Sequence, residues 1–127
     1  MTRDDQHDID ERSLRFFCDV IAFVETVPLG ARTSRIIEQL VDAAGSIGTN
    51  RDEAKGGSSR GEFIRFNENS LRGANNSVHW LQVCADRKLG SQEKCVTLLN
   101  EARQLARTLS RIVITAKRRG DDPRVPI

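Results

Sequence analysis

The sequence has few of the residues that mark secreted, membrane-spanning or disulfide-stabilised proteins. Its 127 residues include three cysteines, three prolines, one tryptophan and no tyrosine. An odd and small number of cysteines argues against a disulfide framework. No run of about 18 apolar residues is present to form a transmembrane helix, and the polar start of the chain does not resemble a secretory signal peptide. The sequence therefore predicts a single cytoplasmic domain, spanning 1–127, that does not bind a membrane.

Motifs for catalysis and cofactor binding are also missing. No Glu-x-x-His pair is present for a di-iron bundle site, and no Cys-x-x-Cys pair for zinc or redox chemistry. The glycine-rich stretch at 56–59 lacks the Gly-Lys-Ser/Thr ending of a phosphate-binding loop. Cys18, Cys84 and Cys95 fall on apolar faces and are predicted to be packing thiols. The sequence predicts no catalytic residue, metal site, cofactor or small-molecule substrate, and a protein that is not an enzyme.

Glycines and capping residues divide the chain into four helical segments. Glycine is preferred just beyond a helix end, and here it recurs at intervals of about 30 residues. Polar capping residues precede each apolar run, as Ser59 does with Glu62 three residues later. The pattern predicts helices over 9–27, 33–55, 60–89 and 91–119, with flexible tails at 1–8 and 120–127.

Each helical segment has one apolar face, which predicts an all-α fold, an antiparallel up-down four-helix bundle. On the first segment the apolar face covers about half of the circumference, which is wider than two bundle neighbours require. The excess suggests a second buried contact with another subunit. Aromatic and exposed apolar residues that could anchor this oligomer interface are Phe16, Phe23, Trp80, Val96 and Ile114.

Charge is distributed unevenly along the chain. The net charge is only +2, but residues 1–30 hold three basic and seven acidic residues. The fourth segment carries a basic face whose arginines could bind phosphate groups with paired hydrogen bonds. The candidate nucleic-acid-binding residues are Arg103, Arg107, Arg111, Lys117, Arg118 and Arg119. Two alternatives remain open: this face could simply be solvated, or it could form salt bridges with the acidic first helix of a neighbouring subunit.

A polar cluster is expected where the second and third segments form an antiparallel hairpin. This pairing would place Asn50 opposite Asn67, and Gly45 near Gly73. The two asparagines could form a buried hydrogen-bonded couple that fixes helix register. Alternatively they could line a polar pocket in which Glu53 is the only ionisable residue.

The middle of the chain resembles a known bacterial family. The resemblance rests on Gln39-Leu40, on Ala43-Ala44-Gly45-Ser46-Ile47, on Asn50 with Glu53, and on Glu62-Phe63-Ile64-Arg65-Phe66. This pattern is similar to that of the four-helix-bundle family related to the 23S ribosomal RNA intervening-sequence proteins. The family includes the accessory protein of diversity-generating retroelements. The similarity extends over roughly 14–115. The sequence departs from the family pattern at Arg51 and Asn67, where apolar residues are usual, and at Ser70, Arg72-Gly73 and Asn76-Ser77.

The resemblance implies a cytosolic homo-oligomeric ring, commonly of five chains, with no known enzymatic activity. For some relatives it implies binding of nucleic acid through a basic surface. We therefore expect a non-enzymatic scaffold or interaction module whose partner is the chain itself, most simply as a pentamer. The alternative is a protein that binds RNA, a ribonucleoprotein or DNA through the fourth helix.

Overall fold

A computed structural model describes residues 3–121, and within this range it contains four helices and no strand. They are α1 (Arg3–Val24), α2 (Ala31–Gly56), α3 (Arg60–Asp86) and α4 (Gln92–Asp121). The all-α prediction and all four helical segments are confirmed. α1 begins earlier than expected, inside the segment that was expected to be a tail, where aspartates favour a helix start. Residues 1–2 and 122–127 of the expected tails lie outside the described residues.

The helix ends follow the local capping chemistry. Ser59 is the N-cap of α3, and its hydroxyl accepts the backbone N–H of Glu62 at 3.1 Å. In return the Glu62 carboxylate accepts the backbone N–H of Ser58 at 2.9 Å, and this hydrogen bond lowers the pKa of Glu62. The turn into α4 contains Gly90 with a φ of +67°, a conformation that glycine adopts without strain.

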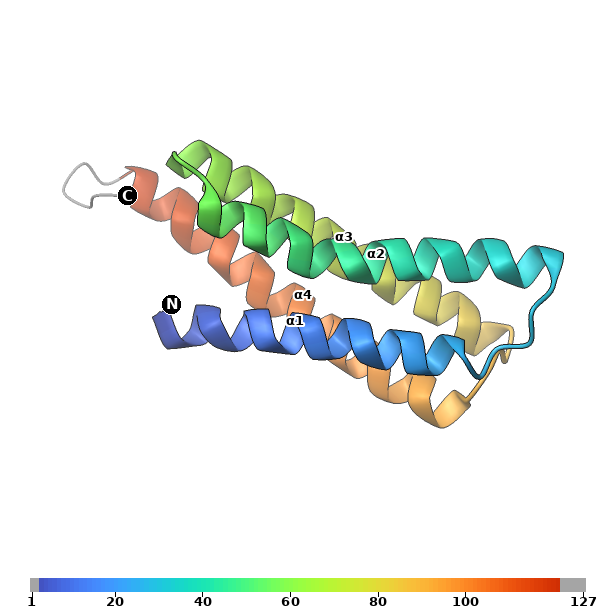
Figure 1. The fold of residues 1–127 in the computed structure, drawn as a ribbon. Helices are drawn as coiled ribbons and strands as arrows, with labels where there is room; N and C mark the ends of the chain where they lie inside the picture. Colours follow the sequence, from blue (N-terminus) through green and yellow to red (C-terminus); the bar gives the residue numbers. More distant parts are fainter. Residues whose placement is uncertain (1–2, 122–127) are drawn as a thin grey trace.

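Successive helices run in opposite directions (Figure 1). α3 packs against α2 and α4, and α1 completes the bundle by packing against α2 and α4, so the helices surround one core. The antiparallel pairing of α2 and α3 is visible in the contacts. The Ser70 hydroxyl donates to the Ile47 carbonyl at 2.8 Å, and Gly73, one turn later, lies against Ala43, one turn earlier.

At Gly73, α3 lies directly against α2. A Cβ atom at this position would overlap the Ser46 hydroxyl and would lie 2.9 Å from the Ala43 carbonyl oxygen. The expected close approach at Gly73 is therefore confirmed, but its partner is not Gly45. Gly45 instead faces α1, where an added Cβ would lie 3.2 Å from a ring carbon of Phe17.

The core is built from aliphatic side chains of all four helices together with two phenylalanines of α1. Fully or almost fully buried members include Val20, Leu40, Ile47, Leu81, Leu105 and Leu109. Phe16 and Phe23 belong to the same core, with 1% and 0% of their surfaces exposed. They have no surface left for a second subunit, so their expected interface role is wrong. Within the described range, no helix combines the length and apolar character that crossing a membrane requires.

Candidate functional site

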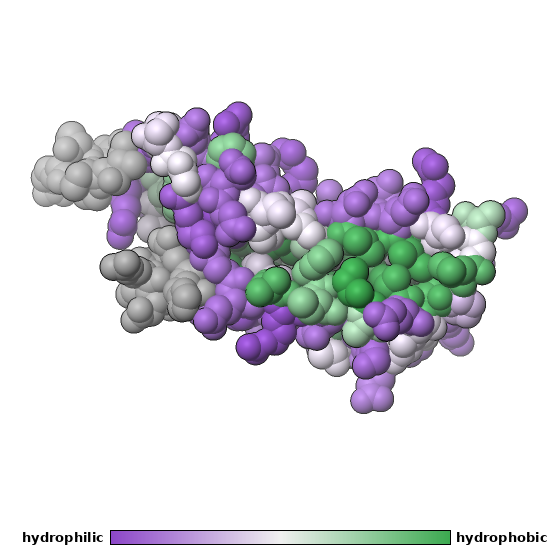
Figure 2. Space-filling view, in the orientation of Figure 1, coloured by the Kyte–Doolittle hydropathy of each residue, from purple (hydrophilic) through white to green (hydrophobic). Residues whose placement is uncertain are grey.

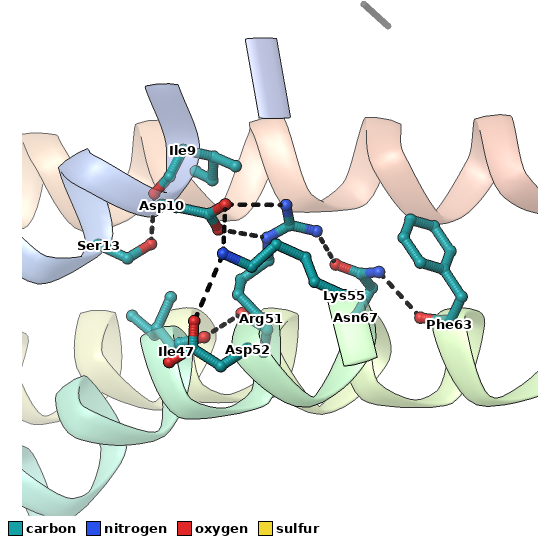
Figure 3. A network of polar contacts seen from close by, with 10 residues as sticks. Ile9, Asp10, Ser13, Ile47, Arg51, Asp52, Lys55, Phe63 and Asn67 are labelled. Atoms are coloured by element: carbon teal, nitrogen blue, oxygen red, sulfur yellow. Dashed lines mark hydrogen bonds and ion pairs between the residues drawn. The ribbon is translucent and has the colours of Figure 1, made fainter. Parts of the chain in front are cut away.

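A buried arginine joins α1, α2 and α3 in the N-terminal half of α1 (Figure 3). Arg51 is fully buried. Its Nε donates to Asp10 Oδ1 at 2.9 Å, and its Nη1 donates to Asn67 Oδ1 at 2.8 Å. Asn67 uses its own amide N–H to reach the Phe63 carbonyl at 2.8 Å. A buried charge requires a partner of opposite charge and satisfied hydrogen bonds, and Asp10 and Asn67 supply both.

Lys55 closes this network on the solvent side. Its Nζ lies 3.0 Å from Asp10 Oδ2 and 3.5 Å from Asp52 Oδ1. The hydrogen bond to Asp10 raises the pKa of Lys55, with partial opposition from burial and further support from the charges of both aspartates. Among the described residues, every buried side-chain nitrogen or oxygen has a hydrogen-bond partner. The buried part of this network, formed by Arg51 and Asn67, is therefore fully hydrogen-bonded and ties three helices together.

The structure rearranges the polar cluster that was expected at this place. Asn67 is buried, but its partner is Arg51, while Asn50 donates to the Ser46 carbonyl of its own helix at 2.8 Å. The expected Asn50–Asn67 couple is therefore wrong. Glu53 is exposed and does not take part in the network.

An open groove lies beside the network, between α1 and α2. It encloses about 650 Å³. Its apolar surface comes from Leu14 and Phe17 of α1 and from Val41 and Ala44 of α2. Figure 2 shows apolar surface between these two helices, running from the middle of α1 toward its C-terminal end. The remaining lining residues are Asp10, Ser13, Asp42, Gly45, Ser46, Gly48, Thr49 and Asp52.

The basic residues expected on α4 all lie on the surface. Arg103, Arg107, Arg111, Lys117, Arg118 and Arg119 are exposed. Two of them make side-chain contacts, Arg103 with Gln82 at 3.3 Å and Lys117 with Glu68 at 3.4 Å. The other four have no hydrogen-bond or ion-pair partner among the described side chains. α4 therefore presents cationic groups that are available to an external anion.

The remaining interface candidates also keep exposed surface. Val96 and Ile114 of α4 are 55% and 47% exposed, and Trp80 of α3 is half-buried. Leu14 of α1 is also exposed, at 66%.

The cysteines divide into two kinds. Cys84 and Cys95 are buried, as expected for packing thiols, and Cys18 is exposed. Burial raises the pKa of Cys84 to about 11, with a further contribution from Cys95, and burial also raises the pKa of the Cys95 thiol. Both thiols are therefore kept protonated and poorly nucleophilic at neutral pH. The part of the chain described contains no group of three or more His, Cys, Asp or Glu side chains placed to hold a metal ion.

Arg51 and Asp10 were not recognised as a pair from the sequence, although a signal was present. Arg51 is one turn beyond Ile47 and one turn before Ala54, so it occupies the buried face of α2. A charged residue on such a face requires a partner of opposite charge. Asp10, about two turns into the first helix, was available to fill that role.

Comparison with known proteins agrees with this architecture. The family model described as 23S rRNA-intervening sequence protein matches residues 5–111. The chain is also similar to the crystal structure of a protein of unknown function from the S23 ribosomal protein family of Bacteroides thetaiotaomicron. The TM-score is 0.76 at 22% sequence identity, and the similarity covers 86% of this chain and 97% of the other. No curated protein matches the chain. With a family model that spans most of its length and a shared four-helix fold, the chain belongs to the 23S rRNA-intervening sequence protein family.

Proposed function

We propose that this protein is a non-enzymatic scaffold that assembles with copies of itself. The observation that carries the proposal is the presence of large exposed apolar side chains on two separate surfaces. Leu14 lies at the groove between α1 and α2, and Val96 and Ile114 lie on the outside of α4. Apolar residues gathered beside a groove are typical of a surface that another protein covers.

The test is the native mass measured by light scattering after size-exclusion chromatography. We expect a mass that is a multiple of 14.2 kDa, and the ring implied by the family resemblance would contain five chains. A strict monomer at high micromolar concentration would contradict the proposal. The measurement should be repeated at low and high salt, since charged rim contacts weaken with salt whereas apolar contacts do not.

A second candidate function is binding of RNA or DNA through α4. It is supported by the unpartnered Arg107, Arg111, Arg118 and Arg119, because a run of exposed arginines attracts phosphate groups. A gel-shift assay at low salt compares the wild type with Arg103→Ala/Arg107→Ala/Arg111→Ala. The matched control is Arg32→Ala/Arg35→Ala/Arg72→Ala, which removes the same charge from other exposed sites. Equal binding by both triple variants would exclude Arg103, Arg107 and Arg111 as the binding residues.

A further inference from the structure

We propose that the groove between α1 and α2 receives the outer face of α4 from a second copy of this chain. The inference rests on the proposed self-assembly and names the two surfaces that meet. In this arrangement each chain gives its α4 to one neighbour and accepts α4 from another. The contact joins two different patches, so it adds further chains, and it closes into a ring where the rotation between neighbours allows.

The groove has the shape and charge to receive a basic helix. Its lining includes three carboxylates, from Asp10, Asp42 and Asp52, and no basic side chain. Between them lies apolar surface from Leu14, Phe17, Val41 and Ala44. Gly45 and Gly48 add no side chain to this lining, so they keep the groove open on the α2 side.

The outer face of α4 has the complementary chemistry. Between Val96 and Arg118, seven residues fall within an arc of about 80° at 100° per residue, on the side opposite the buried residues of this helix. Glu93, before this stretch, falls at the edge of the same arc. We call this arc the outer stripe of α4; it consists of Val96, Asn100, Arg103, Arg107, Arg111, Ile114 and Arg118. All seven are exposed. The stripe thus combines two apolar side chains with four positive charges, which matches an apolar groove that carries carboxylates.

One pair of charges sets the register of the contact. In the groove, Asp10 and Asp52 are already held by Arg51 and Lys55, whereas Asp42 has no ion-pair partner among the described residues. Asp42 lies one helical turn from Gly45, and on α4 Arg111 lies one turn from Ile114. Seating Ile114 over Gly45 of the neighbour therefore brings Arg111 to Asp42. With α4 of one chain parallel to α2 of the other, this register places an apolar side chain on the groove and pairs Asp42 with Arg111.

The experiment is a charge exchange between the two surfaces. Asp42→Arg and Arg111→Asp each place like charges together at every contact, and each should weaken self-association by about tenfold or more. The double variant Asp42→Arg/Arg111→Asp restores opposite charges in reversed order and should recover the native mass. Masses are measured by light scattering over a dilution series, and circular dichroism verifies that each variant is helical.

Matched controls reverse charges away from both surfaces. Asp19→Arg on α1 and Arg72→Asp on α3 change exposed residues outside the groove lining and outside the outer stripe. We expect both to keep the wild-type mass.

The outcomes separate this inference from the proposed function. A wild type that is monomeric at all concentrations overturns the self-assembly on which the inference rests. An assembly that persists unchanged in Asp42→Arg and in Arg111→Asp leaves self-assembly standing and overturns the groove as its interface. Loss of assembly in both single variants without recovery in the double variant overturns the pairing of Asp42 with Arg111.

Discussion

Arg51 carries a full positive charge at a position with no solvent exposure. Removing a guanidinium from water is unfavourable unless a carboxylate and further hydrogen bonds replace the lost hydration. Asp10 supplies the carboxylate from α1, and Asn67 supplies an amide oxygen from α3. Arg51 and Asn67 are two of the positions at which the sequence departs from the family pattern that it resembles. Their side chains share a direct hydrogen bond, so these two polar residues satisfy each other in the interior.

Loss of Asp10 should destabilise the fold strongly. Asp10→Ala leaves the Arg51 guanidinium buried without its counterion, and we expect the free energy of unfolding to fall by about 3 to 5 kcal/mol. Urea unfolding followed by circular dichroism measures this change. Asp8→Ala is the matched control, because Asp8 is exposed and lies 3.7 Å from Arg12 in a surface pair. That control should cost less than about 0.5 kcal/mol.

The same prediction has an internal check. Replacing both polar residues together, as Arg51→Met/Asn67→Leu, removes the buried charge and its amide partner and leaves Asp10 paired with Lys55. In that background Asp10→Ala should cost much less, because no buried charge loses its counterion. An equally large cost there would show that Asp10 acts through Lys55 and not through Arg51.

The sequence did not show which of two neighbouring residues, Asn50 or Arg51, points into the site. Asn50 and Arg51 are neighbours, and one step along a helix turns a side chain by about 100°. The periodic pattern placed the polar pair correctly at the end of the α2–α3 contact but selected Asn50 as the inward residue. Asn50 was the more plausible buried residue by polarity alone, since arginines are rarely buried without partners. Recognition of Arg51 required knowing that Asp10 of a distant segment would face it.

At the scale of elements, small and hydroxyl-bearing residues govern how α2 and α3 meet. α3 presents a buried row of Asn67, Ser70, Gly73, Ala74 and Ser77. The serine hydroxyls donate to backbone carbonyls, Ser70 across to Ile47 and Ser77 to Gly73 of its own helix, both at 2.8 Å. With no large side chain between them, the two backbones approach closely, and the contact depends on shape more than on apolar volume.

A single methyl group should therefore disturb this contact. Gly73→Ala places a Cβ against the Ser46 hydroxyl and the Ala43 backbone, and the backbone cannot yield as a flexible side chain would. We expect a loss of about 1 to 3 kcal/mol in the free energy of unfolding, measured by urea titration. Gly56→Ala is the control, because nothing lies within 4 Å of a Cβ there. It should leave stability unchanged or raise it by less than about 1 kcal/mol. Equal effects at both sites would show that the contact of Gly73 with Ser46 and Ala43 does not limit stability.

Element-scale features were the most predictable from the sequence. Glycines, caps and three- to four-residue spacing gave four helices and an antiparallel hairpin, because these signals act within a few turns of one helix. The close approach at Gly73 was also expected from the register. The expected partner of Gly73 was Gly45, but Gly45 faces Phe17 on α1, and Gly73 contacts Ala43 and Ser46 instead. A helical pattern shows which residues share a face, but the choice between two neighbouring helices depends on how all four pack.

At the scale of the whole molecule, the near-neutral charge conceals two opposite surfaces. The groove lining between α1 and α2 holds carboxylates and no basic side chain, and the outer stripe of α4 holds arginines and no acid. The sequence revealed this division of charge but not the groove, since no helical wheel shows which seam between helices stays open. Phe16 and Phe23 were misassigned for the same reason: a wide apolar face on α1 serves the core with one half and the groove with the other.

The two candidate functions use the same surface and should therefore compete. If the outer stripe of α4 occupies a neighbour's groove, a polyanion must displace that neighbour in order to reach Arg107 and Arg111. Thermodynamic linkage then requires RNA to weaken self-association by the same factor by which self-association weakens RNA binding. In sedimentation velocity with a fluorescent single-stranded RNA at low salt, we expect the RNA to migrate with smaller protein species as its concentration rises. Arg72→Asp, which leaves both surfaces intact, should behave as the wild type. RNA that binds the full assembly without reducing its size would show that the stripe stays free, and would place the contact between copies elsewhere on the bundle.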